Sequence, residues 1–166
     1  MAIEHDYFGL LSTGPDGAIF WTERVDFGDQ SVTVDLTAPD QDDVSQAALD
    51  AAAALISGLE TLDDVVRRAM LAEVDDRTSE VTEFILQQQE AHGDQLEDVL
   101  VDVSGDAAVD IIRSLTLMSM TILADEHGGS DPFVVMEYAL DADATDDVLL
   151  VNLDSDGSVL SVMSAD

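Results

Sequence analysis

The order of hydrophobic and polar residues in the first forty positions predicts β-strands. Residues 31–36 alternate strictly between polar and apolar side chains, as expected for a strand with one buried face. Gly28 and Asp29 are typical of a tight hairpin before this strand, and "GPDG" at 14–17 is typical of a turn after a short strand near 7–11. We therefore predict a three-stranded meander. Four residues of one parity should face its core: Ile19, Trp21, Val25 and Phe27.

The apolar period lengthens to that of amphipathic helices in the middle of the chain. Gly58 and Gly93 mark two helix ends, and Asp106 is an expected N-cap. One helix should bury a face made of Val81, Phe84, Ile85 and Gln88. The predicted helices span residues 39–58, 62–74, 79–92, 95–103 and 106–115.

Strand periodicity returns near residue 115 and continues to the end of the chain. The predicted strands span residues 115–123, 133–140, 148–153 and 158–163. Strands at both ends of a helical middle indicate an α+β fold. We expect a single domain over residues 1–166 with an antiparallel β-sheet. An N-terminal three-stranded meander and a C-terminal four-stranded meander would form the sheet, with the central helical segment packed on it.

The amino-acid composition indicates the solvent conditions in which this protein works. Acidic residues number 37 against 5 basic ones, which gives a net charge of −32. All the basic residues are arginines, and 46% of the chain is hydrophobic, so a disordered acidic segment is excluded. Like charges in a compact state repel, and molar salt shortens the Debye length to about 3 Å. The pattern is typical of extreme halophiles with a salty cytoplasm, so we expect a cytoplasmic protein whose folding depends on salt.

Several classes of function are disfavoured by composition. The chain has no cysteine, which excludes disulfides and thiolate metal sites. The first residues lack the features of a signal peptide, and the longest uncharged run, 114–124, is far shorter than the ~18 residues of a membrane span. Without lysine there is no P-loop, and Arg67, Arg68 and Arg77 lie among acids with which they should form ion pairs. We expect neither nucleic-acid nor membrane binding, and no cofactor.

The segment "NLDSDGSV" near the C-terminus offers two interpretations. Asp154 and Asp156 could belong to a calcium loop, but Gly157 follows the second acid directly, and position 12 of such a loop would be Ala165. An Asp-Gly pair between two alternating strands is instead a strong hairpin signal. We interpret the segment as a turn.

Two weak candidates for chemistry remain. Asp125, Glu126 and His127 are adjacent in a loop and could contribute to a metal or acid–base site, although no established metal-ligand spacing is present. Glu137 interrupts an apolar strand, and a buried carboxylate there could act as an acid or base. The favoured interpretations are a flexible hairpin connection and a solvent-facing strand position, so we predict no metal site and no catalytic set.

The sequence also resembles a family. The opening "HDYFG", the tryptophan at 21 and the ending "DPFVVMEYALD…DDVLLVNLDSDGSVLSV" are similar to an uncharacterised prokaryotic family called domain of unknown function 2004. The resemblance covers most of the chain and rests on apolar and turn positions, so it implies a fold and no catalytic residues. Related small domains are proposed as toxin-immunity proteins.

Two functional hypotheses follow. The first is a non-enzymatic protein-binding or adaptor module, with an immunity-like role as one form of it. The alternative is a small metal-dependent or acid–base hydrolase that uses the Asp125-Glu126-His127 region. The partner and the oligomeric state are not determined by the sequence.

Overall fold

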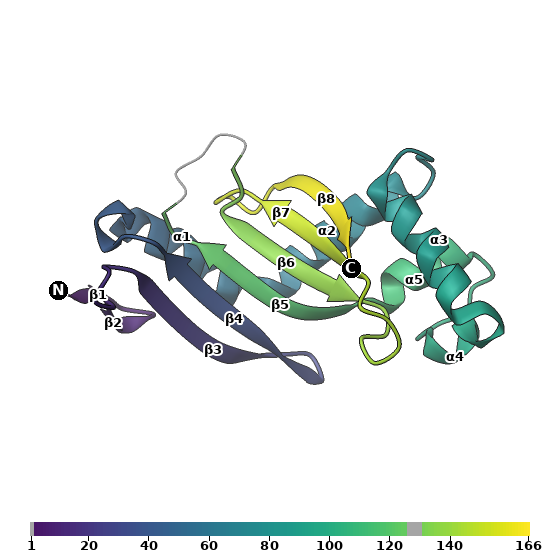
Figure 1. Cartoon of the computed structure of the whole chain (residues 1–166), viewed down its shortest axis with the longest axis horizontal. Coiled ribbons are helices and arrows are strands. Elements are labelled where there is room, and N and C mark those ends of the chain that lie inside the picture. Colours follow the sequence, from purple (N-terminus) through teal and green to yellow (C-terminus); the bar gives the residue numbers. More distant parts are fainter. Residues whose placement is uncertain (1, 126–130) are drawn as a thin grey trace.

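Two hairpins form the N-terminal part of the molecule (Figure 1). β1 (Ala2–His5) pairs with β2 (Gly9–Ser12), and β3 (Ile19–Phe27) pairs with β4 (Gln30–Ala38). The second hairpin turns at Gly28, whose φ of +58° lies in the left-handed region that favours glycine. The structure is a computed structural model, and it describes residues 2–125 and 131–166.

The predicted N-terminal meander is wrong in its connectivity. β1 and β2 form a separate two-stranded sheet, and a bridge between Thr13 and Ile19 connects them to the main sheet. The turn at 14–17 is confirmed, because the Gly17 N–H donates to the Gly14 carbonyl at 3.0 Å. β1 was not predicted, since four residues are too few to show a period. Its pairing also moves Tyr7 from the predicted strand into a turn.

Five α-helices and two 3-10 turns follow β4 in the described chain. Their bounds are η1 Gln41–Asp43, α1 Gln46–Ser57, α2 Leu59–Glu73, α3 Glu80–His92, η2 Gly93–Gln95, α4 Leu96–Val99 and α5 Ala107–Ser114. Side chains cap three of the α-helices at the N-terminus: Ser45 accepts from Ala48 N–H, Ser79 from Val81 N–H and Asp106 from Val109 N–H. The predicted cap at Asp106 is therefore confirmed. So is the predicted inward face of α3, whose four residues are all buried.

α4 is shorter than the predicted helix over 95–103. Polar side chains of and near α5 bind the backbone beyond Val99 and hold it out of the helix. Ser114 Oγ accepts the Val101 N–H at 2.8 Å, and Asp110 accepts both the N–H and the hydroxyl of Ser104 at 2.8 and 2.7 Å. Such side-chain bonds compete with helical ones.

The C-terminal strands form the predicted antiparallel meander. They are β5 (Thr116–Leu123), β6 (Val134–Ala139), β7 (Val148–Leu153) and β8 (Val159–Ala165). The main sheet has six strands in the order β3-β4-β5-β6-β7-β8. It is mixed rather than antiparallel, because β4 and β5 run parallel. The whole helical segment connects these two strands, and a long crossover of this kind is what a parallel pair requires.

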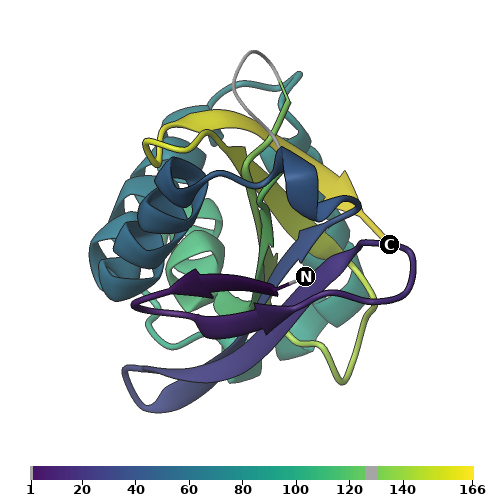
Figure 2. The ribbon, with the colours of Figure 1, turned by 90° about the vertical axis from the view of Figure 1, so that its left-hand side faces the viewer.

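α1 and α2 cover one face of the sheet (Figure 2), and α3 and α4 lie at its end (Figure 1). A row of buried residues crosses that face in register from β4 to β8: Val34, Met120, Met136, Val151 and Val162. Residues of the other parity are half-buried or exposed, except the buried Ala139 at the end of β6 and Leu117, which a register shift in β5 pairs with Tyr138. The alternation predicted for β4 and β6 is confirmed, since a sheet with one covered face needs apolar residues at every second position.

Candidate functional site

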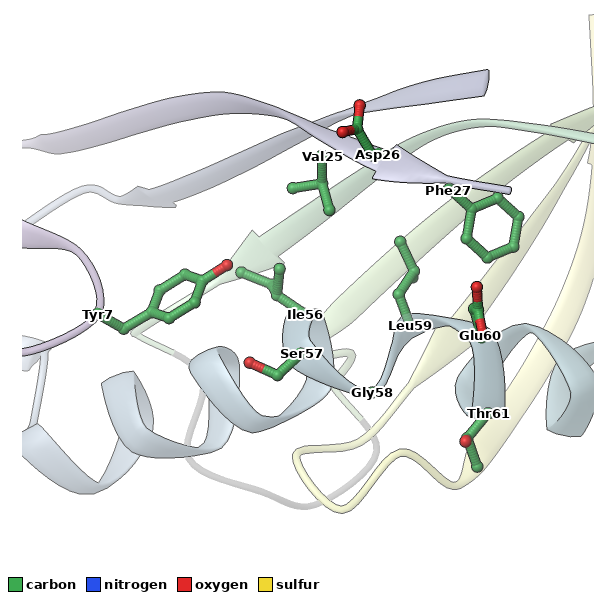
Figure 3. A pocket seen from close by; sticks show the side chains of 10 residues that line it. All are labelled: Tyr7, Val25, Asp26, Phe27, Ile56, Ser57, Gly58, Leu59, Glu60 and Thr61. Atoms are coloured by element: carbon green, nitrogen blue, oxygen red, sulfur yellow. The ribbon is translucent and has the colours of Figure 1, made fainter. Parts of the chain in front are cut away.

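An open cavity of about 350 Å³ lies where three segments far apart in the sequence meet (Figure 3). Tyr7 comes from the β1–β2 turn, residues 25–27 from the end of β3, and residues 56–61 from the junction of α1 and α2. Volumes of this size are at the lower end of those that hold small ligands or partner side chains. The cavity is therefore our candidate binding site.

Aromatic and aliphatic side chains come from five of the ten residues that line the cavity. The Tyr7 ring extends across it from one side toward Ile56, and the Phe27 ring faces Leu59 and Glu60 from the other. Val25 shares the parity of Phe27 and also points inward. Asp26 lines the rim, and its carboxylate points away from the cavity.

Polar groups form the rest of the cavity wall. The Ser57 hydroxyl and the Glu60 carboxylate come from the helix junction, and the Tyr7 hydroxyl comes from the opposite wall. Partial burial, and then the negative charge of Glu23, raise the pKa of Tyr7 above its usual value of 10.0. The phenol is therefore neutral at physiological pH and can donate a hydrogen bond.

Gly58 makes the sharp junction of α1 and α2 that forms one side of the cavity. Its N–H donates to the Ala54 and Ile56 carbonyls, and α2 begins at the next residue without a side-chain cap. A Cβ on Gly58 would lie 3.4 Å from the Ala54 carbonyl oxygen, which is a tight contact. The predicted helix end at Gly58 is confirmed.

A ring cluster behind the cavity holds Tyr7 in place. Trp21 packs edge-on against Phe8 with ring centroids 4.8 Å apart, and Tyr7 lies edge-on to Phe8 at 5.0 Å. The Tyr7 N–H donates to His5 Nδ1 at 3.1 Å, so Nε2 carries the ring hydrogen and donates to Asp50 at 2.9 Å. Trp21 is half-buried against the core on the predicted face.

A buried polar network lies between the helices and the sheet. The Tyr138 hydroxyl donates to Asp63 Oδ1 at 2.7 Å, and Arg67 Nε donates to Asp63 Oδ2 at 2.9 Å. Burial, and then the Asp63 charge, raise the pKa of Tyr138 far above its usual value. The ion pair expected for Arg67 forms within its own helix, but no ion pair of Arg68 or Arg77 is present among the described residues. The hydrogen bond from Tyr138 was not predicted. Its parity indicated only an apolar core position.

Of the residues predicted as candidates for chemistry, the structure describes Asp125 and Glu137. Glu126 and His127 lie outside the described residues, and Asp125 lies in a turn after β5. Glu137 is half-buried on the face of the sheet that the helices leave open, opposite Ser119 and Leu150. The cavity is on the other face.

The interpretation of Asp154 and Asp156 as a turn is confirmed. Asp154 Oδ1 accepts the N–H groups of Asp156 and Ser158 at 3.0 and 2.9 Å, between the paired strands β7 and β8. Gly157 has a φ of +82°, and a Cβ there would lie 3.1 Å from Leu55 and 3.2 Å from Leu62. Glycine is needed for both reasons.

Over residues 2–125 and 131–166, no three His, Asp or Glu side chains are grouped so that they could hold a metal ion. In the same residues, no helix is long and apolar enough to cross a membrane. No family model, no curated protein and no solved structure matches the chain.

Proposed function

We propose that the chain is a non-enzymatic protein-binding module that receives a partner's side chain in the cavity beside Tyr7. The observation that supports this is an open cavity with aromatic walls and Tyr7, 42% exposed, at its mouth. Tyrosine and other aromatic residues in pockets contribute much of the energy of protein interfaces. An adaptor or an immunity-like protein would use such a surface.

The charges of the chain favour a basic partner. The net charge of −32 attracts cations at long range, and Glu60 places a carboxylate inside the cavity. At molar salt the long-range part is screened, so binding must come from close contact. A lysine or arginine side chain suits both features, because its stem is apolar and its head can lie over an aromatic ring.

Site-specific cross-linking tests this proposal. The chain has no cysteine, so Ser57→Cys provides a single attachment point for a photoreactive group at the cavity. Ser31→Cys, at an exposed position of β4, is the matched control. In native extracts at molar salt, we expect the same partner to be captured repeatedly through position 57 and not through position 31. Equal capture at both positions would contradict the proposal.

The captured partner then allows a quantitative test. We expect Tyr7→Ala to weaken binding by about 2 kcal/mol, which is a loss of affinity of about thirtyfold. Phe20→Ala is the control, because Phe20 is 62% exposed but points to the other face of the sheet. Isothermal titration calorimetry in molar potassium chloride would measure both variants. An equal loss in both would show that the cavity is not the binding site.

A further inference from the structure

The two outer strands of the main sheet differ in charge. β3 and β8 are the first and the last strand of the sheet, and Figure 1 shows them as its two borders. β3 carries Glu23, Arg24 and Asp26, whereas β8 carries no charged residue. Charged side chains on an outer strand commonly protect it from pairing with another chain. β8 lacks this protection, although the chain has a net charge of −32.

The backbone of β8 has hydrogen-bonding groups that point away from β7. Ser164 N–H donates to a carboxylate oxygen of Glu80 on α3 at 3.3 Å. In an antiparallel pair, the N–H and the carbonyl of one residue point to the same side, and successive residues alternate between the two sides. Val162, two residues before Ser164, therefore also directs its N–H and carbonyl outward. Within the described residues, no backbone hydrogen bond from outside the sheet reaches these two groups.

β8 also exposes two large apolar side chains. Leu160 is 39% exposed and Met163 is 43% exposed. Met163 pairs with Leu150 of β7, so both lie on the open face of the sheet. An outer strand with free backbone groups, apolar side chains and no charge has the features of a strand that pairs with a further strand.

We propose that two copies of this chain pair through β8. The two strands would run antiparallel about a two-fold axis at Val162, so that the two main sheets join into one. The outward N–H and carbonyl of Val162 in each copy would bond those of the partner. Leu160 of one copy would lie opposite Ser164 of the other, and the Ser164 N–H would exchange the Glu80 carboxylate for the carbonyl of that Leu160.

The charges explain why a second copy fits β8 and not β3. Pairing of β3 with itself about its central residue would place Glu23 opposite Glu23, and like charges directly opposite each other are destabilising. Pairing about Val162 places no acid opposite another, and Asp166 would lie opposite Ser158. Molar salt screens the repulsion between the two acidic surfaces over longer distances.

The dimer would leave the candidate cavity free. Val25, Asp26 and Phe27 of the cavity wall belong to β3, at the border of the sheet opposite β8. Two cavities would then lie at the two far borders of one continuous sheet. A dimer of this kind could bind a partner that has two copies of the recognised side chain more tightly than one chain could.

The mass of the unmodified protein in solution is the first test. Size-exclusion chromatography with light scattering in molar potassium chloride would measure it at micromolar concentrations. We expect twice the mass of one chain. The mass of a single chain over the whole concentration range would overturn the proposal.

Acids placed on the two outer strands locate the interface. Ser161→Asp combined with Met163→Asp puts acids opposite acids in the proposed pair, so this variant should be a monomer where the unmodified protein is a dimer. Phe20→Asp combined with Thr22→Asp is the matched control, because both positions are exposed on β3. The control should remain a dimer. Dimers of both variants, or loss of the dimer only in the control, would overturn the proposal.

Disulfide cross-linking tests the register in a second way. Positions 161 and 163 of opposite copies would form a non-hydrogen-bonded pair with Cα atoms about 4.5 Å apart, which suits a disulfide. The chain has no cysteine, so a mixture of Ser161→Cys and Met163→Cys chains can be oxidised cleanly. We expect a disulfide between unlike chains, identified by mass spectrometry after digestion. A mixture of Ser161→Cys and Ala165→Cys chains, one pair out of register, should form it much more slowly. Equal yields in the two mixtures, or no disulfide in either, would overturn the proposed pairing.

Discussion

Two buried polar clusters lie between the helices and the rest of the molecule, and they differ in how completely they are paired. In the first, Asp63, Arg67 and Tyr138 satisfy one another. In the second, Gln88 Nε2 donates to Asp147, but the Gln88 carbonyl oxygen has no partner within the described residues. The first cluster is fully paired within the fold, and the second is paired only in part.

Arg67 of the first cluster also binds carbonyl groups at the end of a helix. Arg67 donates to the carbonyls of Ile112 and Leu115 at 2.9 and 2.7 Å, at the end of α5 where helical carbonyls lack partners. Its guanidinium also lies 5.3 Å from the centre of the Tyr138 ring. One arginine thus connects α2, α5 and β6. Lysine would not replace it, because the contacts use the fork of the guanidinium.

Removing this arginine should have the largest effect on stability. Arg67→Met leaves the Asp63 carboxylate, in a residue that is 7% exposed, without its cation. We expect a loss of about 3–5 kcal/mol in the free energy of unfolding, measured by denaturant titration in molar salt. Arg68→Met, at the exposed next position, should change it little. Similar losses in both would mean that the buried pair is not what stabilises the fold.

Tyr138→Phe should have a smaller effect that also changes with pH. Removing the hydroxyl leaves Asp63 short of one donor, at about 1–3 kcal/mol. Because folding raises the pKa of Tyr138, its contribution is complete below the unfolded value of 10.0 and decreases as the pH rises above it. The difference between wild type and variant should therefore shrink between pH 9 and pH 11. A constant difference would show that Tyr138 does not titrate on unfolding.

Asp110→Asn should destabilise less than Tyr138→Phe, and its pH dependence should have the opposite sign. Hydrogen bonds from Ser104 lower the pKa of Asp110 below its usual value of 3.8. Its contribution is therefore present above pH 3.8 and disappears as the pH falls through the lowered pKa. Unfolding of wild type and variant from pH 7 to pH 2.5 would measure this, with Asp102→Asn as the exposed control. A difference that grows in acid would contradict it.

Thr145→Val should have the smallest effect of the four substitutions. The variant loses a buried hydroxyl that has no partner within the described residues, so it should be as stable as wild type or slightly more stable. Denaturant titration in molar salt would measure the difference in the free energy of unfolding. A clear loss of stability would show that this hydroxyl is paired in solution.

Much of the local structure was predictable because its causes lie within a few residues. The turns at Gly28 and at Asp154 to Gly157, the cap at Asp106 and the helix ends at Gly58 and Gly93 all depend on neighbouring backbone groups. The buried faces of α3 and β6 were predictable for the same reason. The spacing of apolar residues along a helix or strand is set by the local geometry of the backbone.

The candidate cavity was not predictable, and neither were the two polar clusters. The cavity joins Tyr7 to residues near 26 and 58, and the hydrogen bond between Asp63 and Tyr138 spans 75 positions. Alternation placed Tyr138 in the core but did not show that its hydroxyl would meet an acid there.

The sequence by itself determined the acidic composition, most of the elements and the buried sides of β4, β6 and α3, since these follow from side-chain chemistry and short-range hydrogen bonds. The tertiary structure decided the parallel pairing of β4 with β5, the separation of β1 and β2 from the main sheet, and the partners of Asp63 and Gln88. These depend on how a long helical crossover returns to the sheet. Many such paths satisfy the same local pattern, and only the packing of the whole chain selects one.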